Sequence, residues 1–166
     1  PVRETALRHG FFASFMAKPM ENEPGSAMHI HQSILDAATG QNIFSDADGT
    51  VTPHFRHFIA GLQRYVPQVM PMLAPYVNSY RRLSRYMSAP INVQWGYDNR
   101  TCGIRVPESD PANRRLENRV PGVYVNPYLA MAATLACGYL GLMEKRQPTE
   151  PMKSSAWDHD LSLIHI

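Results

Sequence analysis

The sequence has few cysteines, few charged residues and no long membrane-type run, and each shortage excludes a class of protein. Two cysteines, Cys102 and Cys137, without a CxxC spacing cannot form a disulfide framework, so we expect a reducing, cytoplasmic setting. Charged residues make up 18% of the chain, against roughly 25% in an average domain, which excludes a charged low-complexity arm. The uncharged stretch 128–143 is shorter than the roughly 20 residues that cross a membrane. It predicts a buried core helix and no membrane partner.

Charge is distributed unevenly along the chain. The formal net charge is only +2, so the molecule as a whole has no strong attraction to nucleic acid or to an anionic membrane. Eight arginines nevertheless fall between residues 81 and 119, with only four acidic residues among them. Because the guanidinium group recognises carboxylates and phosphates in a bidentate manner, this excess indicates an anion-binding site.

The hydrophobic pattern predicts an α+β fold, in which an antiparallel sheet carries the polar groups and helices cover its back. Asn126-Pro127 is a good N-cap and first-turn pair for the last long helix. Strands are expected at residues 11–16, 28–35, 91–97, 102–106 and 115–120. Helices are expected at 2–9, at 58–73 with breaks at Pro67 and Pro71, and from 127 to about 146. The stretch 78–90 reads as irregular.

Two histidines alternate on a predicted strand. His29 and His31 are two residues apart, so their side chains point to the same face, where they could hold a metal or a phosphate. A histidine pair of this kind is also common without any ligand. The preceding small residues 24–27 would let backbone N–H groups approach an anion, although the order of residues is not that of a P-loop.

Arg115, Glu117 and Arg119 alternate in the same way. They could form a solvated edge strand with paired charges. Alternatively, Glu117 is a metal ligand flanked by guanidiniums that bind phosphate or carboxylate, with Arg100 and Arg105 converging on it. One carboxylate, two histidines and several arginines suit phosphoryl transfer from a metal–nucleotide complex, in which the protein mainly positions groups and neutralises charge.

A nucleic-acid interface is the third interpretation of the arginines. Aromatic residues lie among them, as in single-strand binding surfaces. The low total charge and the lack of an RNP-like or zinc-knuckle spacing argue against it, and we expect no nucleic-acid partner. The aromatic residues concerned are Tyr80, Tyr86, Trp95 and Tyr97.

The order of five motifs resembles the catalytic C-terminal domain of the glutamine synthetase family. The resemblance covers about residues 3–157, and we take 1–158 as a partial catalytic domain of that fold. The motifs are Lys18 to Ser33 (KP, a spacer, a small-residue run and HxHxS), Asn78 to Leu83, Asn99-Arg100 with Ile104 to Pro107, Arg114 to Arg119, and Asn126 to Leu129.

The resemblance implies a role for each matching residue. It implies a divalent ion (Mg²⁺ or Mn²⁺) held by His29 and Glu117, with ATP as co-substrate. ATP would contact His31, Ser33, Arg105 and Arg115. Glutamate would be bound by Gly25, Arg82 and Arg119, and Arg100 would act catalytically by clamping ATP and the acyl-phosphate. The family phosphorylates the side-chain carboxylate of glutamate with ATP, and an amine then displaces the phosphate.

Three positions depart from the family pattern. Ser88 stands where glutamine synthetases have an acidic flap residue that helps to deprotonate ammonium, Pro24 replaces an Asn, and Ala112 replaces a Lys near the adenine. These changes favour a larger amine acceptor, as in γ-glutamylpolyamine synthetases. Glutamine synthetase proper, which uses ammonia, is the first alternative. A catalytically silent member that serves assembly or sensing is the second.

The resemblance also implies a longer, oligomeric protein. The chain begins Pro-Val-Arg-Glu-Thr, with neither Met nor a signal-peptide core, and we expect it to be cut from something longer. In the family, the other metal carboxylates and a smaller domain lie upstream, and active sites form between subunits of stacked rings. We therefore expect a homo-oligomer, and no turnover by this piece alone. Residues 159–166 do not continue the family pattern and receive no role; a sequencing artefact is one interpretation.

Overall fold

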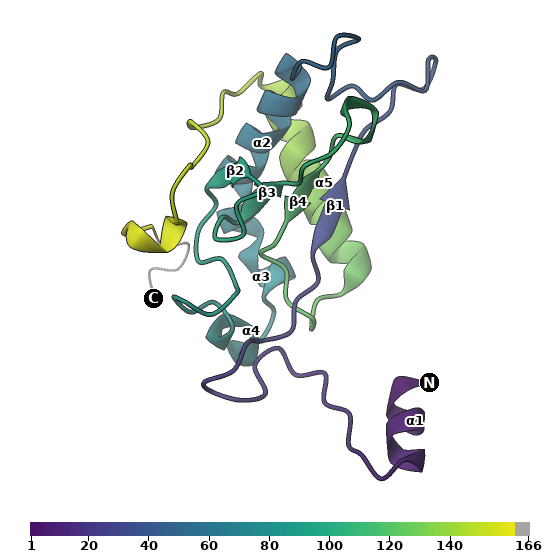
Figure 1. Ribbon diagram of the computed structural model, residues 1–166, viewed down its shortest axis with the longest axis vertical. Helices are drawn as coiled ribbons and strands as arrows, with labels where there is room; N and C mark the ends of the chain where they lie inside the picture. Colours follow the sequence, from purple (N-terminus) through teal and green to yellow (C-terminus); the bar gives the residue numbers. More distant parts are fainter. Residues whose placement is uncertain (162–166) are drawn as a thin grey trace.

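The protein is a small sheet backed by two long helices. The computed structural model describes residues 1–161. Its four strands are β1 (Ile30–Gln32), β2 (Trp95–Tyr97), β3 (Ile104–Val106) and β4 (Leu116–Asn118), arranged in the order β1-β4-β3-β2. Helices α2 (Pro53–Tyr65) and α5 (Pro127–Met143) lie on one face of this sheet (Figure 1). The predicted α+β class is confirmed.

One of the three strand pairings departs from the expected antiparallel sheet. β1–β4 and β3–β4 are antiparallel, but β2 and β3 are parallel, with Trp95 beside Ile104. Parallel neighbours normally need a long crossover. Here each strand has only three residues, about 10 Å, so the six residues 98–103 suffice to return the chain to the start of β3. The loop begins at Asp98, whose φ of 47° turns the backbone sharply.

The two long helices begin where the sequence places caps. Thr52 accepts a hydrogen bond from Phe55 N, and Asn126 accepts from Tyr128 N and Leu129 N. After α2 the chain continues as the 3₁₀ segment η1 (Val66–Val69) and α3 (Met70–Leu73), so the predicted breaks at the two prolines are confirmed. α2 and α5 approach closely at Gly61, which has no side chain. A Cβ there would lie only 2.2 Å from the Cys137 carbonyl oxygen.

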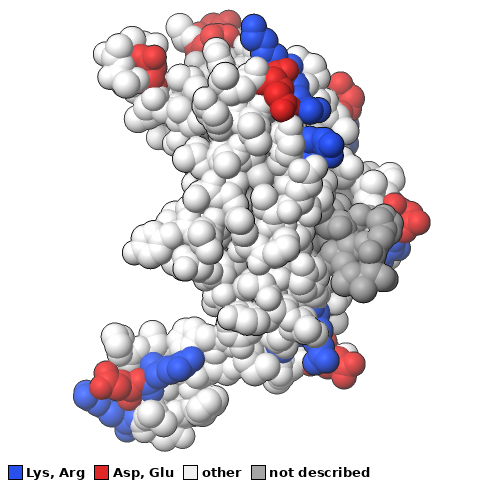
Figure 2. Space-filling model, turned by 180° about the vertical axis from the view of Figure 1, so that it is seen from behind, with Lys and Arg blue, Asp and Glu red and all other residues white. Residues whose placement is uncertain are grey.

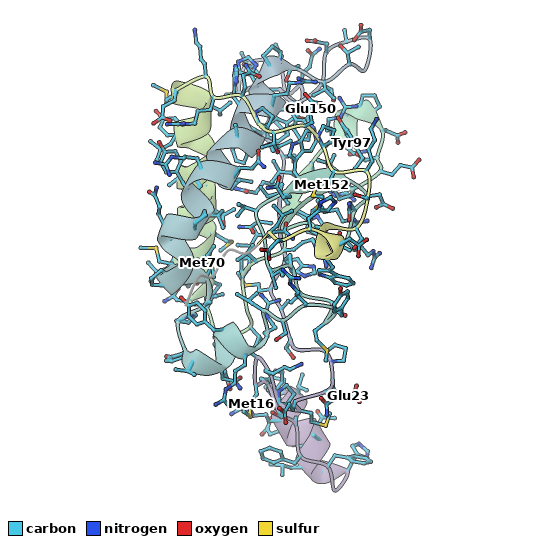
Figure 3. All side chains as sticks on the ribbon, turned by 90° about the vertical axis from the view of Figure 1, so that its left-hand side faces the viewer. Met16, Glu23, Met70, Tyr97, Glu150 and Met152 are labelled. Atoms are coloured by element: carbon cyan, nitrogen blue, oxygen red, sulfur yellow. The ribbon has the colours of Figure 1, made fainter. Side chains whose placement is uncertain are left out.

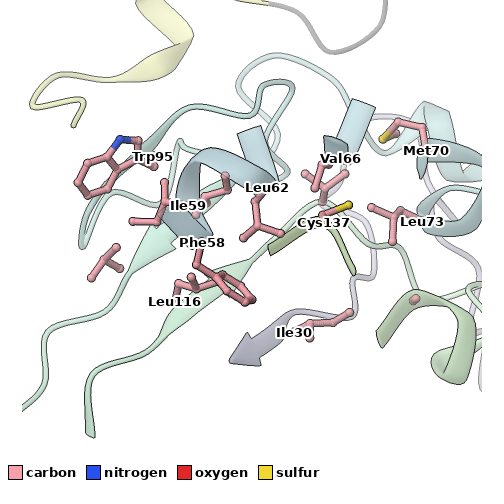
Figure 4. Packing of buried hydrophobic residues seen from close by; sticks show 14 of the residues in the cluster. Ile30, Phe58, Ile59, Leu62, Val66, Met70, Leu73, Trp95, Leu116 and Cys137 are labelled. Carbon is pink, nitrogen blue, oxygen red and sulfur yellow. The ribbon is translucent and has the colours of Figure 1, made fainter. Parts of the chain in front are cut away.

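The core lies between the sheet and these helices. Phe58, Ile59 and Leu62 of α2 pack against Leu116 of β4 and Ile104 of β3 (Figure 4). Both cysteines are buried and free, and no disulfide occurs within residues 1–161. No helix in that range is long and apolar enough to cross a membrane.

α5 is only half buried, in contrast to the predicted core helix. Ala130, Ala133 and Cys137 face the interior, whereas Leu135 and Tyr139 are exposed. Seen from behind, most of the middle of the molecule is uncharged, and the charged side chains lie at its two ends and along one edge (Figure 2).

The N-terminal part differs most from the sequence-based expectation. α1 (Val2–Arg8) is present and is followed by Gly10 with a φ of 75°, as predicted. The strand expected at 11–16 is wrong, because that segment extends from the body without a neighbouring strand (Figure 1), and Phe11 and Phe12 are 70% and 87% exposed. A short helix, α4 (Val77–Arg81), forms in the stretch expected to be irregular.

A C-terminal segment covers the open edge of β2. Met152 N donates to the Trp95 carbonyl oxygen, and Trp95 Nε1 donates to the carbonyl oxygen of Thr149. Figure 3 shows Met152 beside Tyr97 where this segment crosses the sheet. The segment ends in the 3₁₀ turn η3 (Ala156–Asp158), and a second such turn, η2 (Pro111–Asn113), precedes β4. An edge strand covered in this way cannot pair with other chains.

Candidate functional site

Glu117 is the centre of the candidate site. It lies in the middle of β4, opposite His31 of β1 on one side and Arg105 of β3 on the other. Its neighbour Leu116 is fully buried in the core, so the alternation of a strand places Glu117 on the opposite face of the sheet. The register therefore explains why residues distant in sequence meet here.

Two histidines and two arginines surround the Glu117 carboxylate. His29 Nδ1 lies 2.7 Å from Oε1, and His31 Nε2 lies 3.6 Å from the same oxygen. Arg105 Nη1 donates to Oε2 at 3.0 Å, and Arg119 Nη1 is 3.7 Å from Oε1. Both histidines, Glu117 and Arg105 converge as predicted, whereas Arg100, which was also expected to converge here, lines a different cavity.

This environment keeps Glu117 ionised. Burial by itself would raise the pKa of the Glu117 carboxyl. Hydrogen bonds from His29 and Arg105, together with the electrostatic effects of His29 and Arg119, outweigh it and lower the pKa to about 2. The carboxylate is a permanent negative charge at neutral pH, as a cation ligand must be.

Arg105 is held between two carboxylates. It forms an ion pair with Asp98, and its Nε donates to Asp98 Oδ1 at 3.1 Å. Asp98 follows β2 in the return loop and was not among the residues predicted for the site. Its only sequence signal was an acidic residue two positions before Arg100, which is too common to be diagnostic.

Arg82 and Gly25 contact each other next to Arg119, and we call these three residues the floor of the site. Arg82 is 3% exposed and donates from Nη2 to the Val120 carbonyl oxygen. Burial, and secondly the nearby charge of Arg119, lower the pKa of Arg82 to about 10. A Cβ on Gly25 would lie 2.7 Å from Cγ of Arg82. The backbone of residue 25 and the stem of Arg82 are therefore in contact.

Two guanidinium nitrogens at this floor have no partner. The Nε atoms of Arg82 and Arg119 are buried and find no hydrogen-bond acceptor among residues 1–161. Arg119 does donate from Nη2 to the Ser88 carbonyl oxygen at 3.1 Å. Buried donors without acceptors are costly. Both atoms could be satisfied by the oxygen of an anionic ligand.

The remaining predicted residues lie in neighbouring cavities. Ser33 and Arg115 together line a cavity of about 630 Å³, so the two residues could contact one ligand. Arg100 is exposed and lines a different cavity of about 750 Å³ between Asp98 and the segment 151–155. Its charge also lowers the pKa of Arg119 as a minor effect, after burial.

His29 and Glu117 have side chains of the kind that bind a divalent cation, but two ligands are few for such an ion. No group of three or more His, Cys, Asp or Glu side chains within residues 1–161 could hold a metal. His29 Nδ1 and Glu117 Oε1 lie 2.7 Å apart, near enough to bind one ion if it displaces the proton of their hydrogen bond. An ion bound there would take its other ligands from phosphate oxygens, water or further carboxylates.

Comparisons with known proteins agree on one family. Residues 1–162 match the glutamine synthetase catalytic domain. The chain is 44% identical over 149 residues to gamma-glutamylputrescine synthetase PuuA of Escherichia coli. The aligned region covers 90% of this chain and 31% of that protein. It is 36% identical over 159 residues to the glutamine synthetase of Thermococcus kodakarensis, covering 96% of this chain and 35% of the relative.

A solved structure shows the same fold. The structure of GmaS without ligand superimposes with a TM-score of 0.80 at 34% identity, over 95% of this chain and 36% of that one. The chain spans about a third of the length of the curated relatives it matches. With a family match along almost its whole length, this chain belongs to the glutamine synthetase family and corresponds to part of its catalytic domain.

Proposed function

We propose that this chain carries part of the active site of an ATP-dependent ligase that joins an organic amine to the γ-carboxylate of glutamate. The observation that supports it most is the ionised Glu117 carboxylate, 2.7 Å from His29 Nδ1 and contacted by Arg105 and Arg119. Such a group can hold a divalent ion while the guanidiniums neutralise phosphate oxygens.

The proposed reaction has two steps. The γ-carboxylate oxygen of glutamate attacks the terminal phosphorus of ATP, the bond to the ADP oxygen breaks, and γ-glutamyl phosphate forms. The amine nitrogen then attacks the acyl carbon, and the carbon–oxygen bond to phosphate breaks. Phosphate leaves with that electron pair, and the nitrogen releases its proton to phosphate or solvent.

Each cluster has a proposed part in these steps. His29 and Glu117 hold Mg²⁺ or Mn²⁺, which when bound offsets phosphate charge. Arg105, with His31 nearby, contacts the phosphates, and the cavity with Ser33 and Arg115 takes another part of ATP. Arg82 and Arg119 offer their unpartnered Nε atoms to the carboxylates of glutamate beside Gly25. Arg100 clamps the acyl-phosphate.

Ser88 is the reason to prefer an organic amine over ammonia. Its carbonyl oxygen contacts Arg119, so residue 88 lies at the site, yet its side chain is a hydroxyl. A hydroxyl cannot hold or deprotonate an ammonium ion as a carboxylate can. The similarity to a gamma-glutamylputrescine synthetase points in the same direction.

We propose that the activity belongs to a longer, oligomeric protein. The chain covers only 31–36% of the relatives to which it is similar, and its metal cluster has two ligands. We propose that residues 1–158 form part of a catalytic domain completed by further segments and by neighbouring copies in stacked rings. We also propose a cytoplasmic location, on the evidence of two free, buried cysteines.

The direct test is phosphate release by the full-length protein that carries this chain. ATP, Mg²⁺ and glutamate are supplied with ammonia, methylamine, butylamine or putrescine, one at a time. We expect an organic amine to give a higher kcat/KM than ammonia. Faster turnover with ammonia than with every organic amine would instead identify a glutamine synthetase proper. ATP binding without ADP formation under any condition would identify a silent member.

A further inference from the structure

The segment after α4 carries an exposed aromatic residue two positions before a backbone contact to Arg119. Tyr86 is 67% exposed, and its residue lies two positions before Ser88, whose carbonyl oxygen binds Arg119. Two residues of chain span about 7 Å. The backbone of Tyr86 therefore lies within about 7 Å of Ser88, the residue that contacts Arg119.

A second aromatic residue meets it from the C-terminal segment. Trp157 lies in η3, and its ring centroid is 5.8 Å from that of Tyr86 at an angle of 63°. η3 is fixed beside the arginine loop, because Ala156 N donates to Thr101 Oγ1 at 2.8 Å. Thr101 directly follows Arg100. The ring pair therefore joins the segment that carries Ser88 to the C-terminal segment, which packs beside the Arg100 loop.

The backbone around Tyr86 is held in an unfavourable conformation. Tyr86 has a φ of 62° and Ser88 a φ of 34°. For a bulky residue such as tyrosine, left-handed backbone is uncommon and marks a turn, strain or a functional constraint. The turn directs Tyr86 toward Trp157 instead of into the core.

Charge decides what kind of ligand the rings suit. The guanidiniums of Arg82 and Arg119 are almost buried, whereas Tyr86 is open to solvent. A positively charged group is repelled by the inner arginines but is attracted to the face of an aromatic ring. Asp158, which follows Trp157, is exposed and adds a negative charge, and Arg85, which precedes Tyr86, is paired with Asp160. An acceptor with a reactive amine at one end and an ammonium at the other matches this arrangement, in which the arginines lie inside and the aromatic rings lie at the surface.

We propose that Tyr86 and Trp157 form the acceptor subsite for an alkyl diamine. This inference rests on the proposed ligase function. The distal ammonium and its alkyl chain lie on the two rings, and the reactive amine extends inward past Ser88 toward Arg119. The rings contribute the cation recognition that the Ser88 hydroxyl does not provide.

The test uses steady-state phosphate release by the full-length protein with diaminobutane or butylamine as the acceptor. Tyr86→Ala and Trp157→Ala should each raise KM for diaminobutane about tenfold, as expected for loss of a cation–π contact. The KM values for ATP and glutamate should change less than about twofold. Tyr86→Phe keeps the ring and should restore the wild-type KM. KM for butylamine, which has no distal charge, should rise less than that for diaminobutane.

A matched control distinguishes ligand binding by the rings from a structural role in which they only hold the two segments together. Arg85 Nη2 binds Asp160 Oδ1 at 2.6 Å, so Asp160→Ala removes another contact between the same two segments without touching a ring. It should leave all KM values unchanged. The proposal is overturned if the alanine variants raise all three KM values equally, or change none. Wild-type protein that releases no phosphate even with hydroxylamine, a small general acceptor, would contradict the ligase function itself.

Discussion

Gly25 and Arg82 occupy adjoining space that leaves no room for a methyl group. A Cβ on Gly25 would come within 2.7 Å of Cγ of Arg82 and 2.3 Å of the Ala17 carbonyl oxygen. The arginine stem could move, but the backbone oxygen accepts a hydrogen bond from Ser26 N and is fixed. The loop that carries Gly25 and the guanidinium of Arg82 thus form one surface.

Gly25→Ala should damage this surface directly. We expect the glutamate KM to rise at least about tenfold, and the free energy of unfolding to fall by about 1–3 kcal/mol, because of overpacking. Gly122→Ala is the matched control, since its Cβ would meet Arg82 Nε at an ordinary 3.6 Å. Kinetics and chemical denaturation of both variants check the prediction. Equal effects of the two substitutions would contradict it.

Arg82→Lys should change glutamate binding more than ATP binding. Lysine keeps the charge but loses the planar fork, including the Nε that has no acceptor among residues 1–161. We expect the glutamate KM to rise about tenfold or more and the ATP KM to change less than about threefold. Initial rates with each substrate varied in turn measure both. A larger effect on ATP would remove Arg82 from the proposed glutamate set.

Glu117→Gln should abolish turnover while preserving the shape of the side chain. Loss of the charge removes a cation ligand and leaves Arg105 and Arg119 without their shared partner. We expect phosphate release to fall at least about 100-fold, and Mn²⁺ binding, followed by paramagnetic resonance, to weaken. Asp98→Asn removes only the other carboxylate on Arg105 and should reduce both readouts less. Normal activity of Glu117→Gln would refute the metal assignment.

The same carboxylate should make stability depend on acid pH. The pKa of Glu117 falls from 4.5 to about 2 on folding, so between these values the unfolded chain binds more protons. Stability is then lost as pH falls through this window, by on the order of 2–3 kcal/mol for a side chain that is 4% exposed. Urea unfolding at pH 3 to 6 tests this. The difference between wild type and Glu117→Gln should shrink toward pH 3, whereas exposed Glu150→Gln should follow wild type throughout.

The local signals in the sequence were sufficient for several elements. Asn126-Pro127 marks the start of α5 because the amide caps the first turn. The alternation of Arg115, Glu117 and Arg119 predicts one face of a strand, and Glu117 and Arg119 do share the site. His29 and His31 both reach Glu117. These relations depend on strand geometry, which a short motif determines.

Other features depend on partners that a motif does not contain. Residues 11–16 have the composition of a strand but no neighbouring strand in the structure, and strand composition alone cannot supply the hydrogen bonds of a sheet. The Asp98–Arg105 pair arises from the parallel return of β3 beside β2, which the expected antiparallel sheet did not include. Arg115 lines the cavity with Ser33, and its Nη1 donates to the Asn113 carbonyl oxygen at 3.3 Å.

The bare outer side of α5 has a practical consequence for handling the protein. Tyr128, Leu129, Leu135, Tyr139 and Met143 are all more than half exposed on one uncharged helix. Contiguous apolar surface of this kind promotes adhesion and aggregation in solution. Purified by itself, the chain should bind hydrophobic dyes and precipitate at moderate concentration. Lysine or glutamate at positions 135 and 139 should then restore its solubility without disturbing the sheet on the other side.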